Sequence, residues 1–197
     1  MENNSKAALR RAALSRRAAL LPAELTRHSE LLGEQLVQHF PVSEWRWLHV
    51  FLPIVAKSEP DNWLIIRRLW AENRLLSLAA PVVQPDGISL KNYALTPETP
   101  LFLNSWGILE PAATPETEVP PAAFDAVLVP LLVVNVAGHR VGYGGGFYDR
   151  FLATCRPDCL FIGLQVLDEP PVPAIANVLP TDIRLTACLT PGGVWHF

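Results

Sequence analysis

Apolar residues recur at helical spacing in three stretches of the first half of the chain. Residues 5–17 combine Ala, Leu and Arg, which are strong helix formers. A second helix is expected over residues 22–40, because a proline opens it and its core-facing positions are Leu25, Leu32, Leu36 and Phe40. An Asp-Asn pair can cap a third helix over residues 63–73, whose apolar face again predicts one buried side.

Runs of branched and aromatic residues predict six strands, with a helix over residues 147–155 between the fourth and the fifth. The strands are expected at residues 45–52, 75–80, 88–93, 126–134, 160–166 and 183–189. The second is expected to end at Pro81, and the sixth to finish the sheet. Strands that alternate with helices predict an α/β fold with three layers, α/β/α, around a largely parallel sheet.

Six prolines between residues 94 and 123 exclude long regular elements there. A loop of this length in a compact protein usually has a function or serves as a linker. We interpret it as a covering loop, because the strand at residues 126–134 cannot bury both of its faces alone. The sequence therefore predicts a single domain over residues 1–197.

Composition narrows the class of protein. Half of the 197 residues are hydrophobic and 18% are charged, which argues against a disordered chain. The net charge of −3 indicates no general attraction to nucleic acid, and no apolar run reaches the roughly 18 residues that cross a bilayer. Three cysteines, an odd number without a secretory leader, favour the cytoplasm. We expect a cytoplasmic monomer without membrane or nucleic-acid partners.

The basic N-terminal segment allows two interpretations. Its cations are Lys6, Arg10, Arg11, Arg16, Arg17 and Arg27. They can form an ordinary solvated helix face, or some of them can bind an anion. Lys6 and Arg10 lie four residues apart on one helical face, so both can reach the same phosphate chain.

The densest chemical signal is the stretch GHRVGYGGGFYDR at residues 138–150, between a predicted strand and a predicted helix. Its glycines expose main-chain N–H groups to an anion, Arg140 adds a fork of donors, and Asp149 adds an oxygen ligand of the kind that Mg²⁺ prefers. No Gly-Lys-Ser/Thr follows, which excludes a P-loop, and the position in the chain does not fit a dinucleotide fingerprint. We interpret the stretch as a binding site for a nucleoside triphosphate with its metal ion. The alternative is that the glycines only allow the helix to pack tightly on the strand.

This stretch closely resembles the signature of the 5-formyltetrahydrofolate cyclo-ligase family. Four further segments resemble family elements in the same order: KAALR at residues 6–10, FLP with EPDN at residues 51–62, GILEP at residues 107–111 and LPTD at residues 179–182. The resemblance implies a fold similar to that of sugar-phosphate isomerases and CoA transferases. It also implies an ATP- and Mg²⁺-dependent enzyme that converts 5-formyltetrahydrofolate, with or without a glutamate tail, to 5,10-methenyltetrahydrofolate.

The resemblance assigns roles residue by residue. Arg140 and Asp149 are the catalytic candidates, and Asp149 and Asp182 the metal ligands. Contacts to ATP fall on Lys6, Ala7, Ala8, Leu9, Arg10, Arg140, Val141, Gly142, Tyr143, Gly144, Gly145, Gly146, Phe147 and Tyr148. Contacts to folate fall on Leu52, Glu59, Tyr143, Gly144, Gly145, Gly146 and Phe147.

Each role has a plain structural alternative. Asp149 can simply cap a helix, Asp182 and Glu59 can be exposed carboxylates, and Tyr143 and Phe147 can be core aromatics. Gly145 stands where many relatives carry lysine, so Arg140 and the N-terminal cations would have to neutralise more of the phosphate charge. Two other functions remain open: a non-catalytic folate- or nucleotide-binding protein, and a ligase or kinase for another formyl or acyl substrate.

Overall fold

A computed structural model describes residues 4–197. The predicted domain covers residues 1–197, three of which lie outside the described part. That the chain forms a single domain stays a prediction. The helices are α1 (Lys6–Ala18), α2 (Pro22–His39), α3 (Asn62–Glu72) and α4 (Phe147–Leu152). The strands are β1 (Trp47–His49), β2 (Ser77–Val83), β3 (Leu90–Leu95), β4 (Leu101–Leu103), β5 (Leu109–Pro111), β6 (Glu118–Val119), β7 (Ala126–Pro130), β8 (Val133–Val134), β9 (Arg140–Val141), β10 (Leu160–Leu164), β11 (Ala187–Thr190) and β12 (Gly193–His196).

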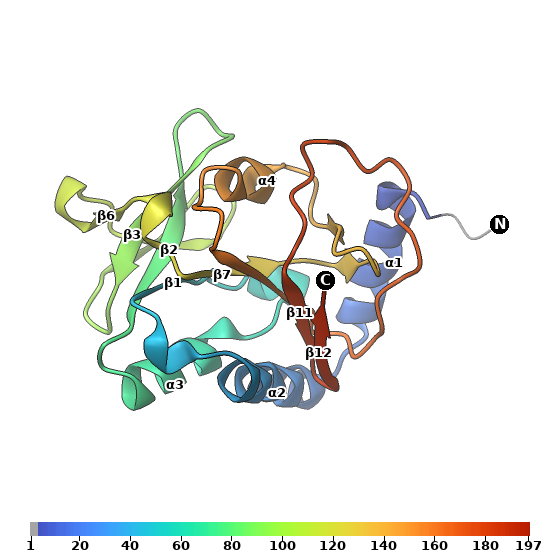
Figure 1. The fold of residues 1–197 in the computed structure, drawn as a ribbon, viewed down its shortest axis with the longest axis horizontal. Coiled ribbons are helices and arrows are strands. Elements are labelled where there is room, and N and C mark those ends of the chain that lie inside the picture. The colour runs from blue at the N-terminus through green and yellow to red at the C-terminus, as the bar shows by residue number, and fades with distance from the viewer. Residues whose placement is uncertain (1–3) are drawn as a thin grey trace.

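The largest sheet has eight strands in the order β12-β11-β10-β7-β1-β2-β3-β6. Its five central strands, from β11 to β2, pair in parallel, and the strands at both edges are antiparallel. α2 and α3 cover one face and α4 lies on the other, with α1 beside the end of the sheet (Figure 1). The predicted α/β class with a largely parallel sheet is confirmed, whereas the comparison with sugar-phosphate isomerases stays a prediction.

Two apolar clusters separate the faces of the sheet. Leu32 and Leu36 of α2 and Ile65 and Leu69 of α3 pack against one face. Phe151 and Leu152 of α4 pack against the other. Each such buried side chain contributes about 1.5–3 kcal/mol relative to an exposed one. The predicted stripe of α2 is confirmed at its two central leucines, while Leu25 and Phe40 are only half-buried.

Helix starts follow their capping residues. Ser5 Oγ accepts the N–H of Ala8 at 3.3 Å at the start of α1, and Asp61 Oδ1 accepts the N–H of Trp63 at 3.2 Å at the start of α3. Such a cap contributes about 1 kcal/mol. Asn62 then donates its side-chain amide to the Phe51 carbonyl at 2.7 Å, which fixes α3 against the segment that follows β1.

Several predicted strand limits are wrong, each for a local reason. β2 continues through Pro81 to Val83. Pro81 pairs with Asn92 of the antiparallel strand β3, and the parallel pairing with β1 on the other side has already ended at Ala79. The stretch 126–134 splits into β7 and β8, and β8 pairs with β9 in a separate two-stranded sheet. The sheet does not finish at β11, because a turn at residues 191–192 returns the chain as β12.

Two other predicted elements are shorter in the structure. Regular pairing in the 45–52 stretch is confined to β1, although Val50, Phe51 and Leu52 are buried beyond it. α4 ends at Leu152 and not at Cys155, and the chain continues in turns toward β10. All three cysteines are free thiols.

His49, at the end of β1, is a buried group without a predicted role. Its ring is fully buried among Phe124, Tyr148 and Phe151, with ring centroids 5.7, 5.8 and 4.9 Å away. Burial lowers the pKa of His49 from 6.5 to about 3, an effect that nearby main-chain groups of Leu128 and His49 itself only partly oppose. The native state therefore holds this imidazole neutral, whereas the unfolded chain protonates it below pH 6.5.

We expect the free energy of unfolding to fall by up to about 4 kcal/mol as the pH is lowered from 6.5 toward 3. The reason is that only the unfolded state takes up a proton on His49 in this pH range. His49→Leu should flatten this part of the stability curve. Urea unfolding at several pH values measures the effect, with His39→Leu as the control because His39 is exposed. Equal slopes for the His49 variant and the unaltered protein would contradict the assignment.

Candidate active site at the glycine loop

The glycine loop, residues 142–146, connects β9 to α4 in a backbone conformation that side chains disfavour. Gly144 has φ +104° and Gly146 has φ +67°. The main-chain N–H groups of residues 144–146 donate no hydrogen bond within residues 4–197. The loop therefore presents three adjacent unpaired amide donors, an arrangement that suits an anion.

α1 brings two cations to this loop. Arg10 donates its Nε hydrogen to the Gly142 carbonyl at 2.8 Å. Its guanidinium lies so close to Gly144 that a Cβ there would be 3.3 Å from an Arg10 nitrogen. Lys6, one helical turn earlier, forms an ion pair with Asp182. The predicted nucleotide segment and the glycine loop are therefore neighbours in space, as their assigned roles require.

Arg140 forms the buried ionic centre of the site. Its side chain is only 6% exposed, and Nη2 donates to Asp149 Oδ1 at 2.8 Å. A second N–H group of Arg140 donates to the Ile183 carbonyl, and the Ile183 N–H donates to Asp149 Oδ1 at 3.1 Å. Asp149 thus ties β9, α4 and the loop after residue 179 together, and it does not cap the main chain of its own helix.

Asp182 is held beside this centre. Burial raises the pKa of its carboxyl, but the Lys6 ammonium, the Leu179 N–H and the positive charge of Arg140 outweigh burial and lower the pKa overall. Its side chain is 13% exposed, which argues against the alternative of a free surface carboxylate. Within residues 4–197, no cluster of three or more His, Cys, Asp or Glu side chains is arranged to hold a metal ion. Any metal here would rely on at most two carboxylates.

Glu59 lies in a second polar group, next to Tyr143 of the glycine loop. Glu59 is 4% exposed, and its carboxylate accepts the Ile54 N–H at 2.7 Å. Burial raises the pKa of Glu59, while the Ile54 N–H, the Tyr143 hydroxyl and the charge of Arg17 oppose that rise. The alternative of a surface-exposed Glu59 is wrong.

Phe147 packs against an aromatic ring and a guanidinium outside these polar groups. Its ring centroid lies 6.4 Å from that of Trp106 in a T-shaped pair, and the Arg150 guanidinium stands 5.5 Å over its face. A Cβ on Gly145 would lie 2.7 Å from the same ring. A side chain at position 145 would therefore displace the Phe147 ring.

The remaining predicted residues contribute less directly. The Leu52 side chain is buried in the apolar cluster on the α2 side of the sheet. Val141 is buried, and its carbonyl accepts the Leu132 N–H at 2.8 Å. Ala7, Ala8 and Leu9 form the first turn of α1, where Leu9 packs against a small apolar cluster. The Tyr148 hydroxyl is buried without a hydrogen-bond partner within residues 4–197.

Arg17 is a site residue that sequence reasoning misses, and it is one of the most deeply buried side chains, at 1% exposure. A sequence signal exists, because Arg17 lies seven residues after Arg10, which places both on one face of α1. The interpretation of the basic segment as a solvated helix face is therefore wrong for Arg17. It holds for Arg11, which is exposed, and for Arg16, which pairs with a surface carboxylate.

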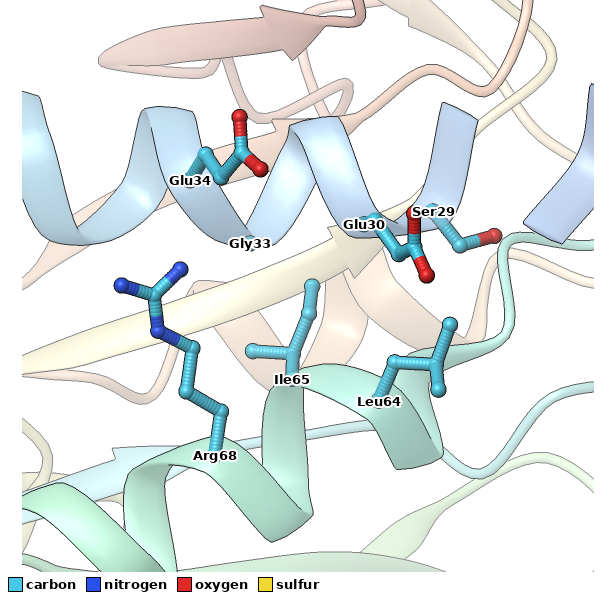
Figure 2. A pocket seen from close by; sticks show the side chains of 7 residues that line it. All are labelled: Ser29, Glu30, Gly33, Glu34, Leu64, Ile65 and Arg68. Carbon is cyan, nitrogen blue, oxygen red and sulfur yellow. The ribbon is translucent and has the colours of Figure 1, made fainter. Parts of the chain in front are cut away.

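A hollow elsewhere on the surface does not compete as a site. It lies between α2 and α3, on the other side of the sheet from α4, and Figure 2 shows its lining by Ser29, Glu30, Gly33, Glu34, Leu64, Ile65 and Arg68. Arg68 Nε lies 3.0 Å from Glu72 Oε1. Arg27 Nη1 lies 3.5 Å from Glu30 Oε2 and 3.8 Å from Glu34 Oε1. Its charges are thus paired within their own helices, as expected of a helix-packing seam.

A family model described as the 5-formyltetrahydrofolate cyclo-ligase family matches residues 2–186. The chain belongs to this family. Members are ligases of folate metabolism, and the match spans α1, the glycine loop and the loop that carries Asp182. No helix within residues 4–197 combines the length and apolarity needed to cross a bilayer.

Relatives agree in sequence and in fold. The 5-formyltetrahydrofolate cyclo-ligase of Escherichia coli K12 is 30% identical over 148 residues, which is 71% of this chain and 76% of the relative. That of Haemophilus influenzae is 37% identical over 99 residues, 48% of this chain and half of the relative's length. The 5,10-methenyltetrahydrofolate synthetase of Aquifex aeolicus superposes with a TM-score of 0.80 at 24% identity, over 97% of this chain and 92% of that one.

We expect Gly144→Ala to destabilise the protein by about 1–2 kcal/mol, because a Cβ is strained at positive φ and would also press on Arg10. Gly142→Ala is the matched control, since a Cβ there would meet nothing within 4 Å and its φ is not positive. Denaturant unfolding of both variants measures the difference. Equal losses would show that the loop does not depend on this conformation.

Proposed function

We propose that this protein catalyses the ATP-dependent cyclisation of 5-formyltetrahydrofolate to 5,10-methenyltetrahydrofolate, with release of ADP and phosphate. Membership of the cyclo-ligase family supports the reaction class. The observation that carries the proposal is the meeting of α1, the glycine loop and the 179–183 loop, through Arg10 on Gly142, Lys6 on Asp182 and Arg140 on Asp149. These contacts bring three cations to the segments next to the glycine loop, where three successive main-chain N–H groups have no partner within residues 4–197.

The reaction needs ATP because ring closure is blocked at two points. The formyl carbon is a poor electrophile, and its oxygen is a poor leaving group. Transfer of the γ-phosphoryl group to the formyl oxygen corrects both. N10 then attacks the formyl carbon, the new C–N bond forms, the C–O bond breaks, phosphate departs and N10 loses its proton. The protein has mainly to align the oxygen with phosphorus and to neutralise charge.

This chain's residues divide those tasks. The amides of residues 144–146, Lys6 and Arg10 would bind the phosphate chain, and Arg140 would stabilise charge on the transferring group. Glu59 would accept hydrogen bonds from the N–H groups of the pterin, and Tyr143 and Phe147 would contact the folate rings. These two sets meet at the glycine loop, where the formyl group and the γ-phosphate have to meet.

Asp149 and Asp182 would hold Mg²⁺. The donor set fits, because Mg²⁺ commonly takes one or two carboxylates and fills its remaining positions with water and phosphate oxygens. Each carboxylate engages its protein partners through one oxygen, and its second oxygen accepts no hydrogen bond in the described part of the chain. When bound, the ion would neutralise phosphate charge and orient the triphosphate.

The full chain, incubated with 5-formyltetrahydrofolate, ATP and Mg²⁺, should form the ultraviolet-absorbing methenyl product with one ADP for each product molecule. Absorbance and ADP release are measured in parallel, and omission of ATP is the control. Binding of folate without ADP release would favour a non-catalytic binding protein. ADP release only with another formyl or acyl compound would favour a different ligase or kinase.

Asp149→Asn should lower kcat by about 100-fold or more, because the amide keeps the bond from Arg140 but loses the charge for the metal. Asparagine is a better choice than alanine, because alanine would leave the buried Arg140 guanidinium without any side-chain acceptor at this position. Asp158→Asn is the control, since its side chain is 75% exposed. A Mg²⁺ titration of turnover with near-normal rates for the Asp149 variant would refute the metal assignment.

A further inference from the structure

Arg17 links α1 to the folate side of the site. One guanidinium nitrogen donates to the Tyr143 hydroxyl at 3.1 Å, and another donates to the Leu131 carbonyl. Arg10, two helical turns earlier, contacts the neighbouring glycine-loop residue Gly142. A helix whose main role was to bind phosphate would need no cation buried at this second position.

The Tyr143 hydroxyl connects Arg17 to Glu59. The Tyr143 hydroxyl and the Glu59 carboxyl lie close enough to shift each other's pKa, and the charge of Arg17 acts on both. The groups that face Glu59 are Arg17 from α1, Tyr143 from the glycine loop, the Ile54 N–H from its own segment, and the Tyr148 hydroxyl from α4. Among these groups, only Arg17 carries a positive charge.

The charge matters because Glu59 is buried. A carboxyl removed from water tends to keep its proton, and burial raises the pKa of Glu59. A protonated carboxyl turns one oxygen into a donor, so it can no longer accept hydrogen bonds from two adjacent N–H groups. A buried cation close by favours the ionised form.

We propose that Arg17 is a positioning residue for folate recognition, which fixes the Tyr143 hydroxyl and keeps the buried Glu59 carboxylate ionised for the pterin of the substrate. This rests on the proposed folate-binding function. In this proposal Arg17 contacts neither the folate nor the ATP directly. The proposal also explains why α1 carries an arginine on its buried face.

The test compares three variants of the full chain. Arg17→Met keeps the apolar stem and removes the charge, Arg17→Lys keeps a charge, and Arg16→Leu removes a neighbouring arginine that pairs with Glu169 at the surface. The pH titration of the Glu59 carboxyl is followed by ¹³C NMR in labelled protein, with Glu59→Gln identifying the signal. Binding of 5-formyltetrahydrofolate is followed by tryptophan fluorescence at the same series of pH values as the NMR titration.

In Arg17→Met, the Glu59 titration should move upward by about one pH unit or more. Folate affinity near pH 7 should fall by about tenfold, with a deeper loss at lower pH and recovery at higher pH. KM for folate should rise far more than kcat falls. Arg17→Lys should restore most of the affinity and the lower titration midpoint, and Arg16→Leu should behave like the unaltered protein.

An unchanged Glu59 midpoint in Arg17→Met would overturn the proposal, and so would a loss of affinity with no pH dependence. If that variant fails to fold, Arg17→Gln removes the same charge while keeping a hydrogen-bond donor near the Tyr143 hydroxyl, and an unchanged midpoint there has the same meaning. Failure of the unaltered protein to bind 5-formyltetrahydrofolate would instead defeat the proposed function, while the NMR titration would still report whether Arg17 controls Glu59.

Discussion

The buried ion pair between Arg140 and Asp149 is the contact on which the geometry of the glycine loop depends. A guanidinium removed from water needs a carboxylate and further acceptors, and Arg140 has Asp149 and the Ile183 carbonyl. Those partners belong to α4 and to the 179–183 loop. Satisfying one buried charge therefore fixes both ends of the glycine loop and places Asp182 beside it.

α1 completes the arrangement through the spacing of its cations. Lys6, Arg10 and Arg17 follow one another by four and seven residues, so they project from one face of the helix. Each contacts a different part of the site: the 179–183 loop, the Gly142 carbonyl and the Tyr143 hydroxyl. The N-terminal helix thus adds little apolar surface to the main core and acts mainly as a rigid carrier of charge.

Sequence reasoning succeeds where one local rule dominates. The predicted Asp61-Asn62 cap locates the start of α3 to within one residue, and the run of helix formers locates α1. It fails where pairing decides, as at Pro81, whose place in β2 depends on an antiparallel neighbour, and at β12, whose short run carries little periodic signal. Motif resemblance groups the glycine loop, Lys6 and Asp182 without any knowledge of the fold. It cannot show that Arg17 is buried, because charge alone predicts a solvated position.

If the proposed function holds, the charges of the site would favour a polyanion that binds together with a metal ion over a free one. Lys6, Arg10 and Arg140 face two carboxylates, Asp149 and Asp182, which leaves an excess of one positive charge. A bare triphosphate would meet those carboxylates as like charges, at a cost that grows where water is excluded. Under the proposed function, a divalent cation held by these carboxylates would turn that repulsion into attraction. The two residues that would repel the nucleotide alone would then favour its binding together with a metal ion.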